Sequence, residues 1–148
     1  MPPTLLVLAG PTAVGKTDLS IRLAQILGTE IISADSRQVY KEMKIGTAVP
    51  DPDQLTAVKH HMIQNKSIHN YFSAGQYELE VLDILKELFK TESVIILTGG
   101  SGMYIDAVCR GIDQISAPDA EIRKKVIRKY ETEGIESIRF DLKRIDPD

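Results

Sequence analysis

Short apolar runs alternate with amphipathic segments along this chain. The runs are typical of strands buried on both faces of a sheet, and they are Leu5–Ala9, Ile31–Ala34 and Val94–Thr98. Apolar residues recur at helical spacing over 17–27 and 76–89, and a further helix is expected after Gly102. The segment Tyr40–Lys66 is rich in turn residues and is predicted to be mainly loop.

Strands and helices that alternate in this order predict an α/β fold, a parallel sheet with helices on both faces. In such sheets ligands bind beyond the carboxyl ends of the strands. Three segments directly follow predicted strands, namely 10–17, 35–38 and 99–102. All three are therefore expected at one edge of the sheet, where they would form a single composite site.

The charged residues divide the chain into two parts. Eighteen basic and twenty-one acidic side chains give a net charge of −3, which neither favours nor excludes a nucleic-acid partner. Residues 118–148 hold eight of each kind, about half of that stretch, whereas residues 1–117 hold ten basic and thirteen acidic ones. We therefore expect an α/β body over 1–117 and a charged helical tail over 118–148, joined by a hinge at Ser116-Ala117-Pro118.

Composition narrows the class of protein further. Apolar residues make up 43% of the chain and charged residues 26%, the balance of an ordinary globular protein. The apolar runs are too short to span a bilayer, and the N-terminus lacks the pattern of a secretory signal. The single cysteine, Cys109, cannot form an internal disulfide and is expected to fill apolar space. A cytoplasmic protein without a membrane partner is expected.

The segment Gly10-Pro11-Thr12-Ala13-Val14-Gly15-Lys16-Thr17 matches the phosphate-loop pattern G-x-x-x-x-G-K-[ST] at every fixed position. Its glycines let backbone N–H groups turn toward an anion, and the next helix offers its positive N-terminal end. Lys16 adds a full positive charge, and the Thr17 hydroxyl can ligate a Mg²⁺ ion held by the same phosphates. A plain glycine-rich turn is the alternative, but the position between a buried strand and a helix favours polyphosphate binding.

The other two strand ends differ in their chemistry. Asp35 follows the second strand, which favours a catalytic or magnesium-linked carboxylate over an exposed loop aspartate or a helix N-cap. ATPases of this fold usually place an acidic residue after a hydrophobic strand, but Thr98-Gly99-Gly100-Ser101 follows the third strand here. The two glycines allow a substrate or another backbone to approach closely, or they form a plain packing turn. The missing acid favours group-transfer enzymes of kinase-like build over motor or switch ATPases.

The three histidines point to local roles. His60, His61 and His69 lack the cysteine or carboxylate cluster that a metal site would need. They are expected to hydrogen-bond to nearby groups in a loop.

The tail is predicted to form two helices separated by Gly134. In the first, over 119–129, Ile122, Val126 and Tyr130 are expected to face inward. The basic residues Arg123, Lys124 and Arg128 are expected on the outer face. That face is either a solvated helix surface or a contact for a phosphate backbone.

Four stretches of the chain form a combined signature: Gly10–Thr17, Asp35-Ser36-Arg37-Gln38-Val39-Tyr40, Ile45-Gly46-Thr47-Ala48 and Gly99-Gly100-Ser101-Gly102-Met103-Tyr104. With them the chain resembles the tRNA dimethylallyltransferases, or tRNA isopentenyltransferases. The second and third stretches together are far more specific than the phosphate loop. The resemblance implies a P-loop NTPase-like core over 1–117, and 118–148 resembles the first part of that family's helical tRNA-binding insertion.

This resemblance implies transfer of a dimethylallyl group from dimethylallyl diphosphate to N6 of adenine 37, in the anticodon loop of tRNA. The loop Gly10–Thr17 would hold the diphosphate with Mg²⁺ at Thr17, and Asp35 would accept a proton from the attacking amine. Ser101 stands where a threonine usually contacts the reacting region, so it is predicted to be catalytic beside Asp35. The tRNA contacts implied by the resemblance are Asp35, Ser36, Arg37, Gln38, Ser101 and Arg123.

Family members are considerably longer than these 148 residues. The chain is therefore expected to be a truncated, N-terminal portion of a monomeric enzyme, without activity on its own. It also departs from the family at Lys59, where a proline is common, and at Gln64, where an aspartate is common.

Three other functions stay open. A small-molecule kinase would use the same phosphate loop and aspartate for ATP-dependent phosphoryl transfer, but it does not need the second and third signature stretches. A related transferase could act on free adenine nucleotide, although the basic helix after Pro118 favours tRNA. A nucleotide- or tRNA-binding fragment without turnover is the non-enzymatic alternative.

Overall fold

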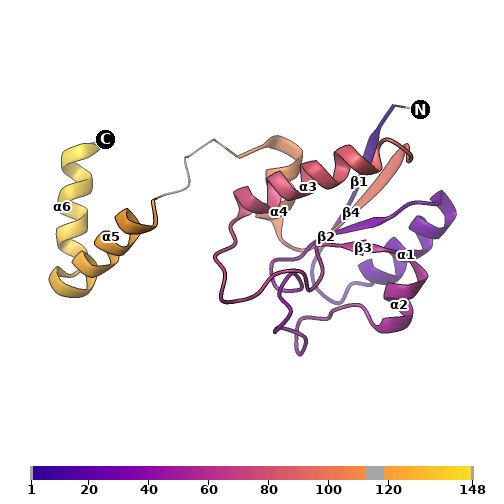
Figure 1. Cartoon of the computed structure of the whole chain (residues 1–148), viewed down its shortest axis with the longest axis horizontal. Coiled ribbons are helices and arrows are strands. Elements are labelled where there is room, and N and C mark those ends of the chain that lie inside the picture. Colours follow the sequence, from indigo (N-terminus) through magenta and orange to yellow (C-terminus); the bar gives the residue numbers. More distant parts are fainter. Residues whose placement is uncertain (1, 113–118, 148) are drawn as a thin grey trace. The chain divides into compact units, whose positions relative to one another are not determined.

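The computed structural model describes residues 2–112 and 119–147 and divides the chain into two compact units, Met1–Ile112 and Asp113–Asp148. Within the described residues, the first unit holds a parallel sheet of strand order β1-β4-β2-β3 (Figure 1). Its strands are β1 (Thr4–Ala9), β2 (Ile31–Ala34), β3 (His60–His61) and β4 (Val94–Gly99). Its helices are α1 (Lys16–Leu27), α2 (Pro52–Ala57), α3 (Ala74–Leu88) and α4 (Gly102–Arg110).

The expected alternation of strands and helices is confirmed, and 40–66 is mainly loop as predicted, although α2 and β3 lie within it. A capping box starts α2: the Asp51 carboxylate accepts from the Gln54 N–H, and the Gln54 side chain accepts from the Asp51 N–H. β3 pairs with the first two residues of β2 and is only two histidines long. A segment so short and polar shows no strand periodicity, so its pairing is decided by the neighbouring strand.

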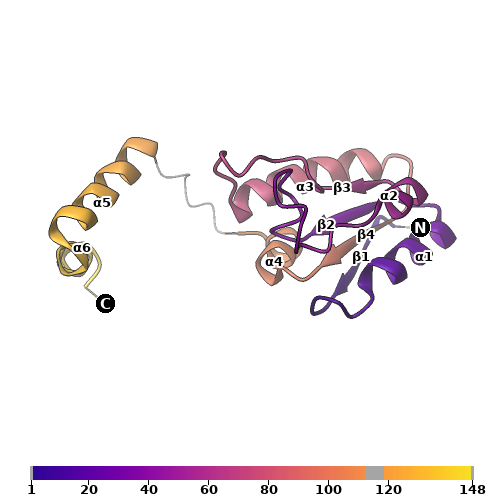
Figure 2. The same ribbon diagram turned by 90° about the horizontal axis from the view of Figure 1, so that it is seen from below.

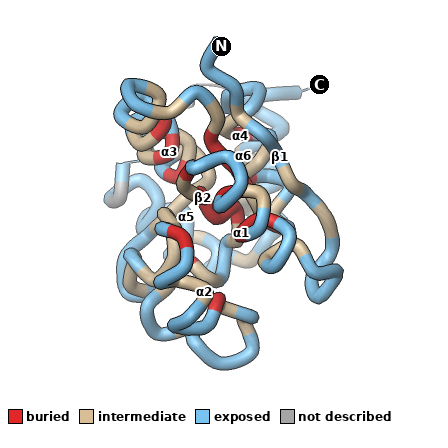
Figure 3. The backbone as a smooth tube through the Cα atoms, turned by 90° about the vertical axis from the view of Figure 1, so that its right-hand side faces the viewer, coloured by how far each residue is buried: buried red, intermediate tan, exposed pale blue. Residues whose placement is uncertain are grey.

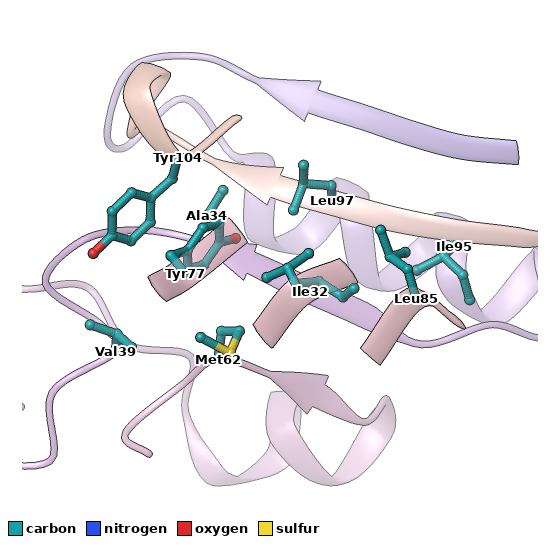
Figure 4. Packing of buried hydrophobic residues seen from close by; sticks show 10 residues of the cluster. Ile32, Ala34, Val39, Met62, Tyr77, Leu85, Ile95, Leu97 and Tyr104 are labelled. Atoms are coloured by element: carbon teal, nitrogen blue, oxygen red, sulfur yellow. The ribbon is translucent and has the colours of Figure 1, made fainter. Parts of the chain in front are cut away.

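Helices cover both faces of the sheet, as predicted, and each face buries its own cluster (Figure 2). On one face, alternate residues of β2 and β4 pack against α3 and α4 (Figure 4): Ile32, Ala34, Ile95 and Leu97 meet Tyr77, Val81, Leu85 and Tyr104. On the other face, Ile31 and Ile96 meet Ile21 and Ala24 of α1. Because successive strand residues point to opposite faces, all four residues of β2 are buried. Figure 3 shows the buried residues as red stretches of the backbone tube, on β2 and on the helices beside it.

β1 is less buried than its apolar sequence predicts. It pairs only with β4 among the described strands, and Leu6 and Val7 are each 37% exposed. The expectation that this strand is buried on both faces is therefore wrong for the described chain, because an edge strand is shielded from one side only. Cys109 is also exposed instead of filling apolar space, since α4 buries Tyr104 and Ala107.

The second unit contains α5 (Ala120–Glu133) and α6 (Ile135–Ile145), and Gly134 ends α5 at a φ of 78°, as predicted. The basic residues Arg123, Lys124 and Arg128 of α5 are exposed, which confirms the expected outer face. Its apolar residues are not buried: Ile122, Val126 and Tyr130 are 57%, 49% and 53% exposed. The expected inward packing is therefore wrong within the described chain, because one short neighbouring helix cannot cover that face.

The hinge predicted at 116–118 lies outside the described residues. Among the helices described in 2–112 and 119–147, each is too short or too polar to cross a lipid bilayer.

Candidate functional site

The segments that follow β1, β2 and β4 line one cavity of about 330 Å³. Because the strands are parallel, their carboxyl ends meet at one edge of the sheet, as the composite site requires. Of the predicted site residues, Thr12, Ala13, Gly15, Lys16, Thr17, Asp35 and Gln38 line this cavity. Gly10, Pro11, Val14, Ser36, Arg37 and Ser101 do not line it, and Arg123 lies in the other unit.

The phosphate loop takes the backbone shape that its sequence demands. Gly15 precedes α1 at a φ of 88°, in the left-handed region where glycine is favoured, and Ala13 also has a positive φ of 65°. α1 then begins at Lys16, so the free N–H groups of its first turn lie beside the loop. The Lys16 ammonium donates a hydrogen bond to the carbonyl of Pro11, which holds its charge at the loop.

Thr17 offers an oxygen ligand for a cation. Its side chain lines the cavity, and its hydroxyl makes no hydrogen bond to any described residue. The described part of the chain contains no cluster of three or more His, Cys, Asp or Glu that could hold a metal ion. A metal at Thr17 would therefore take most of its oxygens from a bound phosphate and from water, which is the habit of Mg²⁺. The donor chemistry fits that ion.

The Asp35 carboxylate is held by its own turn. Its Oδ1 accepts hydrogen bonds from the backbone N–H groups of Arg37 (2.8 Å) and Gln38 (3.1 Å). This is an aspartate-centred turn, which fixes the side chain relative to the end of β2. Among the described residues no donor reaches Oδ2. One oxygen is thus anchored and the other is available to accept a proton.

Ser101 holds the residues on either side of Asp35. Its N–H donates to the carbonyl of Ala34 (3.1 Å), and its Oγ accepts from the N–H of Ser36 (2.9 Å). Although Ser101 is the N-cap residue of α4, its side chain makes no capping hydrogen bond to that helix. The Ser101 hydroxyl thus bonds to the backbone of the turn that carries Asp35, and its catalytic role stays a prediction.

Gly99 is required by packing. A Cβ atom there would lie 2.1 Å from the carbonyl oxygen and 2.4 Å from the carbonyl carbon of Ala34. At Gly100 the nearest atom, the Gly10 carbonyl oxygen, would be 3.4 Å away. The glycine pair was expected either to allow close approach of a substrate or another backbone, or to form a plain packing turn. At Gly99 the structure shows close approach of another backbone.

Gln38 joins two of the signature stretches. Its amide Nε2 donates to the carbonyls of Thr47 (3.0 Å) and Ala48 (2.8 Å), and its Oε1 accepts from the Ser33 hydroxyl (3.3 Å). The turn after β2 is thereby fastened to the segment 45–48. Both N–H groups of the amide are used in this contact between the two stretches.

Tyr77 is a supporting residue that the sequence did not reveal. It is fully buried, its hydroxyl donates to the Ser33 carbonyl (2.8 Å), and its ring stacks on Tyr104 at 4.0 Å between centroids. Burial raises the pKa of Tyr77, so its phenol stays protonated as a donor. Its spacing on α3 marks it only as part of an apolar helix face.

The side of the cavity near α2 and β3 is not predicted by the sequence. Ala48, Pro50, Gln54, His60 and Ile63 line it there. The local hydrogen bond expected for His60 is confirmed, since its Nδ1 lies 2.8 Å from the Val58 carbonyl. The expectation is wrong for His61, whose Nε2 bonds to Glu30, 31 positions away in the sequence, and the pair forms β3 instead of lying in a loop. No long strand precedes these residues, so the strand-end rule could not find them.

Comparison with known proteins agrees with this geometry. A family model described as IPP transferase matches residues 38–148. The tRNA dimethylallyltransferase 1 of Bacteroides thetaiotaomicron is 54% identical over 146 residues, covering 99% of this chain and 47% of that protein. The tRNA dimethylallyltransferase 2 of Porphyromonas gingivalis is 54% identical over 145 residues, covering 98% and 48%. The chain therefore spans about half the length of the curated relatives it matches.

Solved structures show the same fold. The full-length tRNA isopentenylpyrophosphate transferase from Bacillus halodurans matches with a TM-score of 0.72 and 33% identity, over 98% of this chain and 48% of that one. A eukaryotic dimethylallyltransferase, described as acting on tRNA, matches with a TM-score of 0.79 and 28% identity, over 100% and 37%. These matches confirm the predicted P-loop NTPase-like α/β fold.

Proposed function

Since the chain belongs to the IPP transferase family, we propose that it forms the diphosphate-binding and catalytic part of a tRNA dimethylallyltransferase. The reaction would move a dimethylallyl group from dimethylallyl diphosphate to N6 of adenine 37 in tRNA. One observation carries this proposal: a phosphate loop and a carboxylate with one free oxygen, Asp35, line the same cavity.

The phosphate-loop end of the cavity suits a diphosphate leaving group. Among the described residues the Lys16 ammonium has the Pro11 carbonyl as its partner, and a diphosphate would offer it a stronger, charge-assisted hydrogen bond. The N–H groups at the start of α1 would neutralise the charge that develops as the C–O bond breaks. Thr17 would hold a Mg²⁺ ion together with the diphosphate, and the ion would supply further charge neutralisation.

The Asp35 end suits proton transfer from an amine. As the adenine N6 attacks the allylic carbon, an N–C bond forms, the C–O bond to diphosphate breaks, and N6 must lose one proton. The Oδ2 oxygen of Asp35 would accept that proton while backbone hydrogen bonds hold Oδ1 in place. Ser101 would keep this carboxylate in position through its bonds to Ala34 and Ser36.

The tRNA side of the proposal involves exposed residues. Ser36 and Arg37 lie exposed on the turn that holds Asp35, and Arg123 is exposed on α5 in the other unit. These side chains would contact the anticodon loop, whose unpaired bases can be unstacked at low cost. Gln38 was expected to contact tRNA, but its amide already bonds to the segment 45–48. It would therefore support the turn that carries Asp35.

Label transfer tests the proposal. The chain is joined to the remaining residues of the Bacteroides relative, and this chimera is incubated with labelled dimethylallyl diphosphate, Mg²⁺ and either tRNA or ATP. We expect label on tRNA and none on ATP. Label on free nucleotide alone would make the protein a different transferase, and γ-phosphate transfer from ATP to a small molecule would make it a kinase.

A further inference from the structure

The apolar side chains of the cavity lie mainly on one of its walls. Among the described residues that line it, the phosphate loop contributes Ala13, and the side near α2 and β3 contributes Ala48, Pro50 and Ile63. These last three residues form the apolar wall. Ile63 has the largest side chain of the three, and it is only partly buried. In ligand pockets, apolar walls receive the apolar part of the ligand while a few polar groups fix its orientation.

The backbone on both sides of Ile63 is strained. Met62 and Gln64 have φ values of 60° and 49°, in the left-handed region that residues with a side chain rarely adopt. Met62 is buried in the core cluster, and the Gln64 N–H donates to the carbonyl of Gln38 (2.8 Å). Such strain persists only where surrounding contacts enforce it, and it is typical of ligand-binding sites. The position of Ile63 at the cavity is therefore fixed from both sides.

Gln38 connects the apolar wall to the turn that carries Asp35. Its N–H donates to Asp35 Oδ1 (3.1 Å), and its carbonyl accepts from the Gln64 N–H beside Ile63. Its side-chain amide donates to the carbonyl of Ala48 (2.8 Å). One residue thus bonds to the proposed base and to both segments of the wall. The apolar wall is therefore fastened beside Asp35.

The proposed donor substrate has one apolar part, its five-carbon chain. Because the chain and the diphosphate belong to one molecule, a diphosphate at the phosphate loop brings the chain into the same cavity. The carbon bonded to the diphosphate must also reach the amine at Asp35, so the chain has to lie near that residue. The adenine, in contrast, arrives with a macromolecule, from the side of the exposed Ser36 and Arg37. The apolar wall therefore matches the chain.

We propose that Ile63 is a substrate-binding residue whose side chain packs against the dimethylallyl chain, with Ala48 and Pro50 completing the wall. This inference rests on the proposed function. Contact with Ile63 removes apolar surface of the chain from water, which adds affinity in proportion to the area covered. The affinity for the diphosphate itself stays with the phosphate loop.

Calorimetric titration of the 148-residue chain in the presence of Mg²⁺ tests the inference. The ligands are pyrophosphate and dimethylallyl thiodiphosphate, an analogue whose C–S bond resists cleavage. We expect the analogue to bind more tightly than pyrophosphate. Ile63→Ala should reduce this advantage about 5- to 20-fold, the worth of the lost apolar contact, and leave pyrophosphate affinity unchanged.

Two further variants control this measurement. Ile63→Leu keeps the number of carbons and should retain most of the advantage of the analogue. Ile68→Ala makes the same change at a residue that is 51% exposed and does not line the cavity, so it should bind both ligands normally. If Ile63→Ala kept the full advantage of the analogue over pyrophosphate, the inference would be wrong.

Methyl NMR of the unchanged chain provides a second measurement. With carbon-13-labelled isoleucine methyl groups and the bound analogue, we expect nuclear Overhauser effects between Ile63 and the two methyl groups of the dimethylallyl chain. Ile68 should show none. A bound analogue without contacts to Ile63 would overturn the inference. This experiment decides if Ile63→Ala does not fold.

The two proposals fail in different ways. If the unchanged chain does not bind magnesium pyrophosphate, the diphosphate site is wrong and the inference falls with it. If pyrophosphate binds but the analogue binds no more tightly, the inference alone is wrong. It is also wrong if Ile63→Ala in the chimera weakens tRNA binding and leaves analogue binding unchanged, because Ile63 would then contact the RNA.

Discussion

The two units of the chain use similar helices but bury them differently. In the first unit, α3 buries Tyr77, Val81 and Leu85 against the sheet. In the second unit, α6 has no buried residue, and its Ile145 is 76% exposed. Helices gain most of their stability from covering an apolar face, so the first unit has a finished core and the second does not within the described residues.

The polar contacts differ in the same way. In the first unit, hydrogen bonds from α3 and from the start of α4 hold the end of β2 on which Asp35 depends. In the second unit, α5 and α6 are linked by the ion pair of Lys129 and Asp141, whose side chains are more than one-third exposed. Exposed ion pairs stabilise little. In the first unit, hydrogen bonds between distant segments therefore fix the backbone beside Asp35. In the second unit, the helices are joined at the surface.

The largest expected effect breaks the first unit alone. Gly99→Ala forces a Cβ into the backbone of Ala34, so the ends of β2 and β4 must separate. We expect a loss of at least about 3 kcal/mol in the free energy of unfolding, measured with denaturant. Amide NMR signals of 119–147 should persist when those of the first unit are lost. Gly100→Ala is the control, and equal stability of the two variants would contradict the packing argument.

The next effect is on the chemistry of the first unit. In the chimera, Asp35→Asn keeps the shape of the turn but removes the base, so the single-turnover rate should fall by roughly two to four orders of magnitude. Affinity for magnesium pyrophosphate should stay within about twofold, because the proposed role of Asp35 is toward the amine and not the diphosphate. Asp53→Asn, on exposed α2, serves as the control. A rate equal to that of the unchanged chimera would make Asp35 an ordinary loop residue.

Removing the phosphate-loop charge should weaken binding and leave folding intact. Among the described residues, the Lys16 ammonium donates to the Pro11 carbonyl. Lys16→Ala should weaken diphosphate binding about 10- to 100-fold, the worth of a charge-assisted hydrogen bond, as measured by calorimetry. Lys44→Ala, an exposed lysine outside the cavity, should bind normally. If Lys16→Ala bound diphosphate with unchanged affinity, the assignment of this loop as the diphosphate site would be wrong.

The smallest effect concerns the second unit. If the basic face of α5 contacts a phosphate backbone, Arg123→Ala in the chimera should weaken tRNA binding and reduce the salt slope by about one charge. Diphosphate affinity should not change, because the two units would contribute separately. Arg139→Ala on α6, where Arg139 pairs with Glu136, is the control. If tRNA binding by Arg123→Ala had the same salt dependence as binding by the unchanged chimera, the basic face of α5 would be ordinary solvated surface.

Much of the first unit was predictable because its signals are local. The strand β2 lies where its apolar run predicts, and Gly134 ends α5 as its position predicts. The phosphate loop and Asp35 were found for the same reason: each directly follows a strand, and parallel strands bring such positions to one edge. The resemblance of four stretches then indicated the family, which the comparisons confirm.

What the sequence determined by itself is therefore the order of elements, the phosphate loop, the aspartate beside it and the family. Only the tertiary structure decided which contacts these residues make: the approach of Gly99 to Ala34 and the bonds of Ser101 to the backbone on either side of Asp35. It also decided that β1 is an edge strand in the described chain. The reason is physical. Periodicity and turn residues act over a few neighbouring positions, whereas burial and hydrogen-bond partners depend on segments that are distant in sequence and adjacent only after folding.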